Sequence, residues 1–228
     1  MVQNSNIQVV ALEHNMKSKA RQELLTSSKE YLHQAVLMKK QLVLFYSVHD
    51  RKNEMIYLYA KRLDGDLNAL GQDQQISSIG THTFRPNYFR IVPSRYQDEV
   101  LVATVKNPDS VMGPMSIKVL NNQLDVIHKS TLDANLRGAS LSNSVYINGV
   151  WMMMATKTAK DGLFSRVRQK TLVRHDCATS TTQEHPLYAE GWNTLFGEFS
   201  FSPQDSVYTF SSYYFEDDSL KPEGFVQY

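Results

Sequence analysis

The feature that most constrains this chain is a repeated order of strand-like segments. Gln41–Asp50 is an apolar run rich in Val, Leu, Phe and Tyr, which suits a strand buried on both faces. Met55–Leu63 alternates apolar with polar residues, as a half-buried strand does, and residues 70–77 form a more polar segment typical of a sheet edge. This order predicts a small sheet that is buried at one edge and solvated at the other.

The same order recurs along the chain. Apolar runs comparable to Gln41–Asp50 lie at residues 99–106, 150–158 and 206–215, roughly 50 to 60 residues apart, which is a spacing typical of propeller blades. A polar turn and a second strand follow each run, and these second strands begin at Met55, Met115, Leu163 and Phe225. Residues 6–13 resemble such a second strand and open the chain without an apolar partner.

A less regular segment precedes each apolar run, and we expect it to form the innermost strand of its sheet. Each segment ends in residues suited to a hairpin turn, and Asn148-Gly149 is the strongest hairpin signal in the chain. The expected innermost strands are residues 31–40, 84–95, 137–149 and 193–203, with turns at Lys39-Lys40, Pro93-Ser94, Asn148-Gly149 and Pro203-Gln204.

Together these segments predict an all-β fold, a β-propeller of four or five blades made of four-stranded antiparallel sheets. We expect one domain over residues 1–228, with whole blades at about 28–78, 79–132 and 133–183. A half blade at 6–27 and a partial blade at 184–228 would then complete one sheet and close the ring. A piece of a larger propeller, or a subunit whose open edge strands pair with a neighbour, would give the same pattern.

One stretch also fits a different structure. Residues 16–40 contain good helix formers, with Leu24, Leu25, Leu32 and Val36 near helical spacing. An amphipathic helix is the local alternative. We favour two strands, because the repeat places an edge strand and an innermost strand there, and Ser27-Ser28 lies where a turn is expected.

The repeat pattern resembles that of the long-repeat β-propellers. Their units contain an apolar strand, a second strand that ends in a turn similar to Lys61-Arg62-Leu63-Asp64, and a polar closing strand. Residues 122–125 and 173–176 are weaker copies of that turn. The resemblance covers almost the whole chain and implies that a binding surface lies at one end of the central channel, on the loops that lead into the innermost strands.

Composition restricts the function and the compartment. The net charge of +1 favours neither nucleic acid nor a membrane surface, and no apolar run is long enough to cross a bilayer. The first residues do not form a signal peptide, so the sequence at face value predicts a cytoplasmic protein; an exported protein that has lost its signal is the alternative. The single cysteine, Cys177, cannot form an internal disulfide, and no metal-like cluster surrounds it.

The loops that lead into the innermost strands carry a mixture of polar residues and one tryptophan. Such a surface suits a sugar or a peptide. We therefore expect a non-enzymatic binding or scaffold propeller that engages a protein or a carbohydrate, with no cofactor and no metal. The candidate binding residues are His33, Arg85, Asn87, Asp133, Arg137, Glu190 and Trp192.

The alternative is a glycoside hydrolase or an inactive, sugar-binding relative. Residues 137–158 are similar to the inner hairpin of the five-bladed glycosidase propellers, in which two or three carboxylates converge on the channel. This sequence departs from that pattern, since Gln34 and the segment near Gly138 offer no acid at the corresponding positions. The acids near suitable places are Asp133, Glu184 and Glu190, and none lies in a recognisable catalytic motif.

Overall fold

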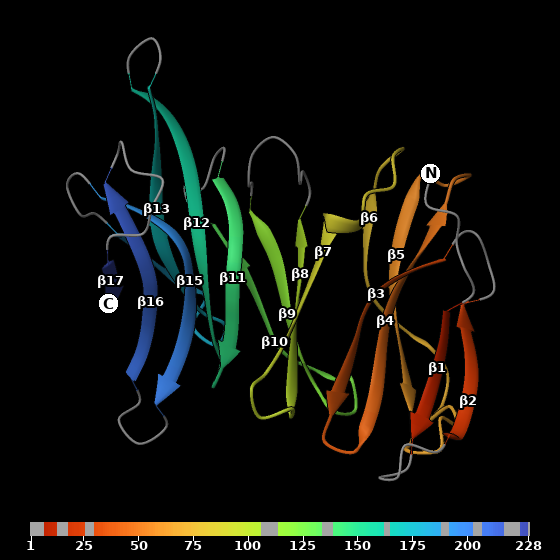
Figure 1. The fold of residues 1–228 in the computed structure, drawn as a ribbon. Helices are drawn as coiled ribbons and strands as arrows, with labels where there is room; N and C mark the ends of the chain where they lie inside the picture. Colours follow the sequence, from red (N-terminus) through yellow and green to blue (C-terminus); the bar gives the residue numbers. More distant parts are fainter. Residues whose placement is uncertain are drawn as a thin grey trace.

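The fold consists of antiparallel sheets that stand side by side in chain order (Figure 1). A computed structural model describes residues 7–12, 18–25, 30–105, 114–133, 139–161, 165–187, 192–202, 207–216 and 224–227. In several of the strands it describes the backbone and not the side chains. The described chain contains no α-helix and is almost entirely β-structure. The protein is an all-β propeller with four-stranded antiparallel sheets, as the sequence predicts.

Each sheet is a meander in which every strand pairs with its neighbour in the sequence. The first sheet holds β1 (Ile7–Leu12) and β2 (Ser18–Leu25), and the second holds β3 (Glu30–Met38), β4 (Gln41–Asp50), β5 (Met55–Leu63) and β6 (Gln74–Gly80). The third holds β7 (Phe89–Pro93), β8 (Glu99–Val105), β9 (Met115–Asn121) and β10 (Val126–Leu132). The fourth holds β11 (Ala139–Ile147), β12 (Val150–Asp161), β13 (Ser165–Asp176) and β14 (Thr181–Leu187), and the fifth holds β15 (Trp192–Ser202), β16 (Val207–Glu216) and β17 (Gly224–Gln227).

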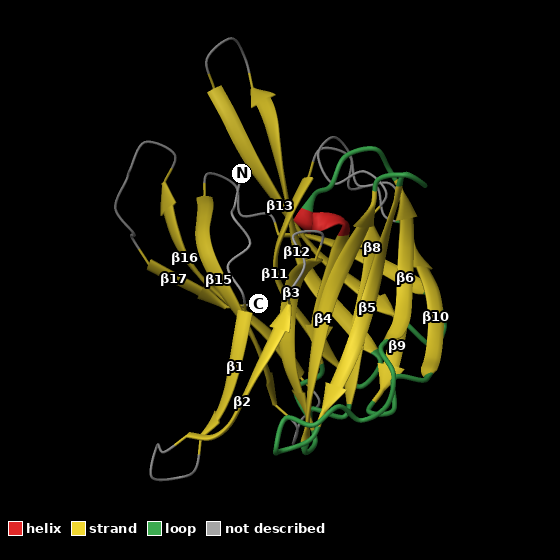
Figure 2. Ribbon diagram, turned by 90° about the vertical axis from the view of Figure 1, so that its right-hand side faces the viewer, coloured by secondary structure: helices red, strands yellow, loops and turns green. Residues whose placement is uncertain are grey.

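The first strands of neighbouring sheets lie next to one another. β3 contacts β7, β7 contacts β11, and β11 contacts β15. A parallel bridge between Ser94 and Tyr146 joins the end of β7 to β11. The last strands β6 and β10 lie at the outer side, as the view turned by 90° shows (Figure 2). The first strands are therefore innermost.

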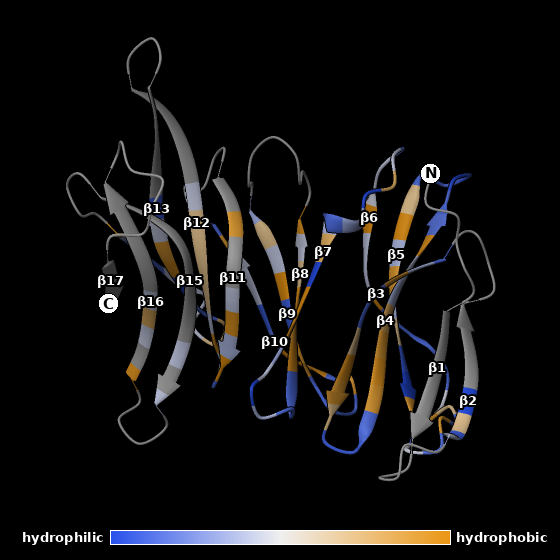
Figure 3. Cartoon of the chain, viewed as in Figure 1, coloured by the Kyte–Doolittle hydropathy of each residue, from blue (hydrophilic) through white to orange (hydrophobic). Residues whose placement is uncertain are grey.

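Burial falls along the second sheet in the order that the sequence predicts. Residues 43–47 of β4 are all buried, and hydrophobic residues follow most of this strand (Figure 3). β5 buries alternate residues, including Ile56, Leu58 and Ala60, whereas β6 buries only Ile76 and Ile79. A strand buried on both faces needs a packed neighbour on each side, and the adjacent sheets supply it.

The core lies between the faces of adjacent sheets. The second and third sheets meet over a cluster that includes Phe45, Ile56, Val100 and Leu120. The third and fourth sheets meet over a second cluster, in which the largest side chain is that of the fully buried Trp151. A smaller cluster around Leu44, Leu63 and Leu67 packs against Ala20 of β2.

The expectation that both ends of the chain complete one sheet is wrong. In the described residues β1 pairs with β2, and β16 pairs with β15 and β17. The first and last sheets stand at opposite ends of the row (Figure 1). Closure by one shared blade requires these two sheets to be adjacent. Each sheet instead packs against its neighbours in the sequence, and the arc remains open.

The stretch with helical spacing forms strands. β2 and β3 cover residues 18–25 and 30–38 in place of an amphipathic helix. Tertiary packing overrides helix propensity here, because Val36 and Met38 are buried against the neighbouring sheet. The preference for two strands is confirmed.

The expected innermost strand at residues 84–95 is shorter than predicted. Its first part forms a single 3-10 turn, η1 (Pro86–Tyr88), and β7 begins only at Phe89. Pro86 accounts for this difference, since its ring fixes φ and it has no N–H to donate to a ladder. The following turn also lies later than Pro93-Ser94, at residues 94–98, where Ser94 Oγ donates to Asp98 Oδ1 at 2.6 Å.

The hairpin at Asn148-Gly149 forms as predicted and gives the first test. Both residues have left-handed φ angles, 49° and 78°, which a two-residue turn of this type requires. We expect Gly149→Ala to lower the free energy of unfolding by about 1 kcal/mol, because a Cβ strains this conformation although no atom lies close to it. Gly65→Ala is the control, since Gly65 lies in open space without a left-handed φ. Equal effects of the two variants in urea unfolding would contradict this explanation.

A buried polar network joins the third sheet to the fourth. His175 is fully buried; its Nε2 lies 2.9 Å from Ser130 Oγ on β10, and its Nδ1 lies 2.9 Å from Thr182 Oγ1 on β14. Buried polar atoms need such partners, because losing one leaves the full desolvation cost.

We expect Ser130→Ala to destabilise the protein by about 1–3 kcal/mol, because it leaves His175 Nε2 buried without a partner. The exposed Ser78 on β6 offers a matched control, and Ser78→Ala should change stability by less than about 0.5 kcal/mol. Urea unfolding of the two variants measures both values. A Ser130→Ala protein as stable as the control would mean that the hydrogen bond contributes nothing.

Candidate functional site

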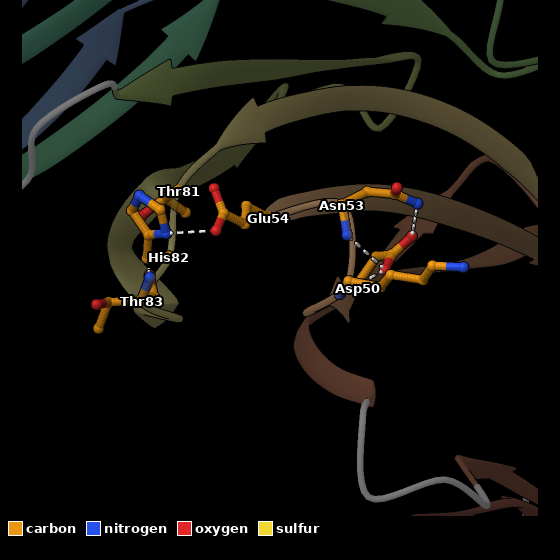
Figure 4. A network of polar contacts seen from close by, with 7 residues as sticks. Asp50, Asn53, Glu54, Thr81, His82 and Thr83 are labelled. Carbon is orange, nitrogen blue, oxygen red and sulfur yellow. Dashed lines mark hydrogen bonds and ion pairs between the residues drawn. The ribbon is translucent and has the colours of Figure 1, made fainter.

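One end of the sheets brings together the β4–β5 turn, the β6–β7 connection and the start of β3. We call it the upper end, after its place in Figure 1. A polar network lies on its rim (Figure 4): Glu54 Oε1 lies 2.9 Å from Nδ1 of the exposed His82, and the Glu54 carbonyl accepts a hydrogen bond from the backbone N–H of Thr81 at 2.7 Å. The Asp50 carboxylate accepts hydrogen bonds from the backbone N–H of Lys52 and Asn53, which fixes the turn.

His33 occupies a break in the ladder of β3. The register between β3 and β4 shifts between Leu32 and Gln34, so His33 is the extra residue of a β-bulge. Its Nε2 lies 3.0 Å from Oγ of the fully buried Ser47, and the backbone carbonyl of Pro86 accepts a hydrogen bond from the ring. Burial lowers the pKa of His33 from 6.5 to about 4, so the ring is neutral at pH 7.

Aromatic side chains surround His33. The rings of Tyr31 and Phe89 meet it edge-on, with centroids 5.1 and 5.6 Å away. Phe84 contacts Tyr31 at 5.4 Å and His49 at 6.1 Å. We call these five side chains the aromatic patch. All except the buried Phe89 are partly exposed, so the patch lies at the border between the core and the surface.

The structure brings three of the predicted binding residues together. The bond from His33 to Pro86 places the imidazole beside the segment that holds Arg85, which is half-buried, and Asn87, which is exposed. Arg85 precedes η1 in an extended conformation, with φ −141°.

Of the other four predicted residues, the structure describes the side chain of Asp133 alone. Asp133 is exposed and follows β10 at the end of the third sheet. Arg137 and Glu190 lie outside the described residues, and only the backbone of Trp192 is described, as the first residue of β15. Sequence reasoning missed Tyr31 and Phe84. Each is an aromatic residue in a segment that was expected to start an innermost strand, and this position could have indicated that both lie near the site.

Register shifts recur in the innermost strands. β11 shifts against β12 between Ser142 and Ser144, and β15 shifts against β16 between Thr194 and Gly197. The shift in β15 lies near the start of its strand, and the shift in β11 lies at the middle of its strand. Bulges turn side chains out of the regular alternation and are enriched next to binding sites.

The pair His175 and Cys177 does not form a reactive centre. Cys177 is a free, buried cysteine, and burial raises the pKa of its thiol to about 12, so it stays protonated. Both ring nitrogens of His175 are already engaged by hydroxyl groups.

Among the described residues, no three His, Cys, Asp or Glu side chains are grouped closely enough to hold a metal ion. The described part of the chain also has no helix of the length and hydrophobicity that membrane crossing requires.

Comparison with known proteins supports the fold alone. No protein-family model matches the sequence, and no curated protein matches it significantly. A chimera of apocarotenoid oxygenase and RPE65 has a TM-score of 0.50 at 10% identity, over 95% of this chain and 52% of that chain. A mutant of the Synechocystis apocarotenoid oxygenase gives 0.49 at 11% identity, with the same two coverages. The endo-arabinase of Bacteroides thetaiotaomicron VPI-5482 gives 0.36 at 10% identity, over 92% of this chain and 80% of that chain.

The chain spans about half the length of the two oxygenase structures. At these identities the likeness concerns the arrangement of strands and carries no residue roles.

The burial of His33 predicts a loss of stability in acid. The folded-state pKa of about 4 lies below the unfolded value of 6.5, so the unfolded chain takes up the proton first as the pH falls. The contribution of neutral His33 is therefore complete above pH 6.5 and declines by up to about 3 kcal/mol towards pH 4. Unfolding free energies of wild type and His33→Gln between pH 7 and pH 4 measure this, and the variant should show the shallower decline. Parallel curves would contradict the assignment.

Proposed function

We propose that this protein is a non-enzymatic binding propeller that holds a carbohydrate against the aromatic patch at its upper end. The observation that carries the proposal is the hydrogen bond from the bulged His33 to the backbone of Pro86, which sets Arg85 and Asn87 beside partly exposed aromatic rings.

The chemistry of this group suits a sugar. Tyr31 and Phe84 present ring surface on which the C–H face of a pyranose packs, and the Tyr31 hydroxyl adds a polar group. Arg85 supplies guanidinium donors, and the exposed Asn87 supplies both a donor and an acceptor. A few polar groups around an apolar floor are typical of small-molecule and sugar sites.

The arrangement of acids favours binding over hydrolysis. Cleavage of a glycosidic bond needs two carboxyl groups about 5 to 9.5 Å apart on either side of the bond. Two acids of the rim are engaged, Glu54 by His82 and Asp50 by its own turn. Gln34 occupies the position next to the bulge, where a carboxylate would be needed for the hydrolase alternative.

The expected result is binding of at least one glycan in a glycan microarray, with the sugar recovered uncleaved. Tyr31→Ala should weaken that binding at least about tenfold in calorimetry, because it removes the stacking surface. Tyr96→Ala is the matched control and should leave affinity unchanged, since Tyr96 is 48% exposed in the β7–β8 turn at the opposite end of the sheets.

Three outcomes would overturn the proposal. Cleavage of the bound glycan would make the protein an enzyme. Equal losses of glycan affinity in Tyr31→Ala and Tyr96→Ala would show that the glycan does not bind at the aromatic patch. If no glycan binds and the protein instead binds a protein partner through Tyr31, the ligand of the aromatic patch is a protein.

A further inference from the structure

A second concave region lies at the outer side of the fold, where the second and third sheets separate. It is a groove of about 720 Å³ between β6 and the strands β8, β9 and β10. The aromatic patch, in contrast, lies at the starts of β3 and β7. Hydroxyl and amide side chains dominate the groove wall, which includes those of Gln75, Ser77, Ser78, Thr104, Ser116 and Thr131.

Three cross-sheet hydrogen bonds hold the two walls of the groove together. Ser77 Oγ lies 2.7 Å from Thr104 Oγ1, and Gln74 Nε2 donates to the Leu124 carbonyl at 3.1 Å. Lys118 Nζ donates to the Ile76 carbonyl at 2.6 Å. These bonds join residues 27 to 50 positions apart in the sequence, so the groove exists in the folded protein before any ligand arrives.

Two lysines lie side by side on the β9–β10 wall. Lys118 and Lys129 are directly paired across the two strands, Lys118 half-buried and Lys129 exposed. Like charges in this position destabilise a sheet. Burial lowers the pKa of Lys118, and the neighbouring charge of Lys129 lowers it further. The repulsion between the two lysines therefore lowers the stability of the unliganded protein.

No acid compensates the two lysines within the described part of the chain. Neither ammonium group forms an ion pair with a described carboxylate. Asp125 and Asp133, which stand at either end of β10, do not line the groove. A smaller extension of about 350 Å³ shares Ser116, Lys118 and Thr131, continues past Lys129 to Ser180, and is likewise lined without a described acid.

We infer that this groove is an anion site that binds a phosphate or sulfate group carried on a hydroxyl-rich ligand. The two ammonium groups supply the charge, and the serine and threonine hydroxyls supply short hydrogen bonds to the remaining oxygens. A bound oxyanion removes the repulsion between the lysines, so relief of this repulsion contributes to the free energy of binding. The site is independent of the aromatic patch and of the function proposed for it.

The test measures thermal unfolding of the whole chain with millimolar sodium pyrophosphate, sulfate or chloride at one ionic strength. We expect pyrophosphate, sulfate or both to raise the Tm above its value in chloride. Lys129→Gln should lose most of that rise, with affinity weakened about tenfold or more. Lys52→Gln is the matched control, since Lys52 is exposed in the β4–β5 turn and should keep the full rise. A rise with pyrophosphate alone identifies a phosphate ligand, and one with sulfate alone identifies a sulfate ligand.

The comparison with Lys52→Gln matters because sulfate and phosphate also stabilise proteins by exclusion from their surface, which affects both variants equally. An equal rise in Lys129→Gln and Lys52→Gln, or none in wild type, would overturn the inference. The stability without anions gives an independent check. Lys129→Gln should be as stable as wild type or more stable, because it relieves the repulsion. A lower Tm for this variant would mean that Lys129 stabilises the fold and that the two lysines do not repel each other enough to favour anion binding.

Discussion

The fold depends on burying both faces of the second strand in the second, third and fourth sheets. β4 contains a run of five buried residues, and β12 is buried without interruption from Val150 to Ala155. A strand of this kind cannot lie at a surface, so the second, third and fourth sheets must each be packed between two others. The hydrophobic effect thus fixes the stacking of the sheets in the order of the sequence.

Polar contacts then select how the stacked sheets align. Ser130 and His175 join the third sheet to the fourth inside the core, and Tyr146 donates to Glu99 Oε2 at 2.5 Å across the same interface. Such bonds add little net stability, but each is costly to leave unmade. They therefore penalise any sliding of one sheet against the other more than apolar packing alone does.

The interface between the second and third sheets carries both candidate sites. Apolar side chains fill its middle, and the two sheets diverge towards the outer side. At the upper end the rings around His33 are partly exposed, and at the outer side Lys118 and the hydroxyl groups face the groove. The divergence leaves the outer border open as the groove and makes it available to a ligand.

The sequence by itself determined the strands, their order within each sheet and the decrease of burial from β4 to β6. These properties are local: a period of two residues defines a strand, and a continuous apolar run defines one buried on both faces. It also named His33, Arg85 and Asn87 among seven candidate binding residues. Only the tertiary structure decided that the arc stays open, that Tyr31 and Phe84 complete the patch, and that Lys118 lies against β6. Those relations depend on how the sheets pack against one another. Packing brings Lys118 to Ile76, which is 42 residues away in the sequence, and no local sequence pattern indicates such a contact.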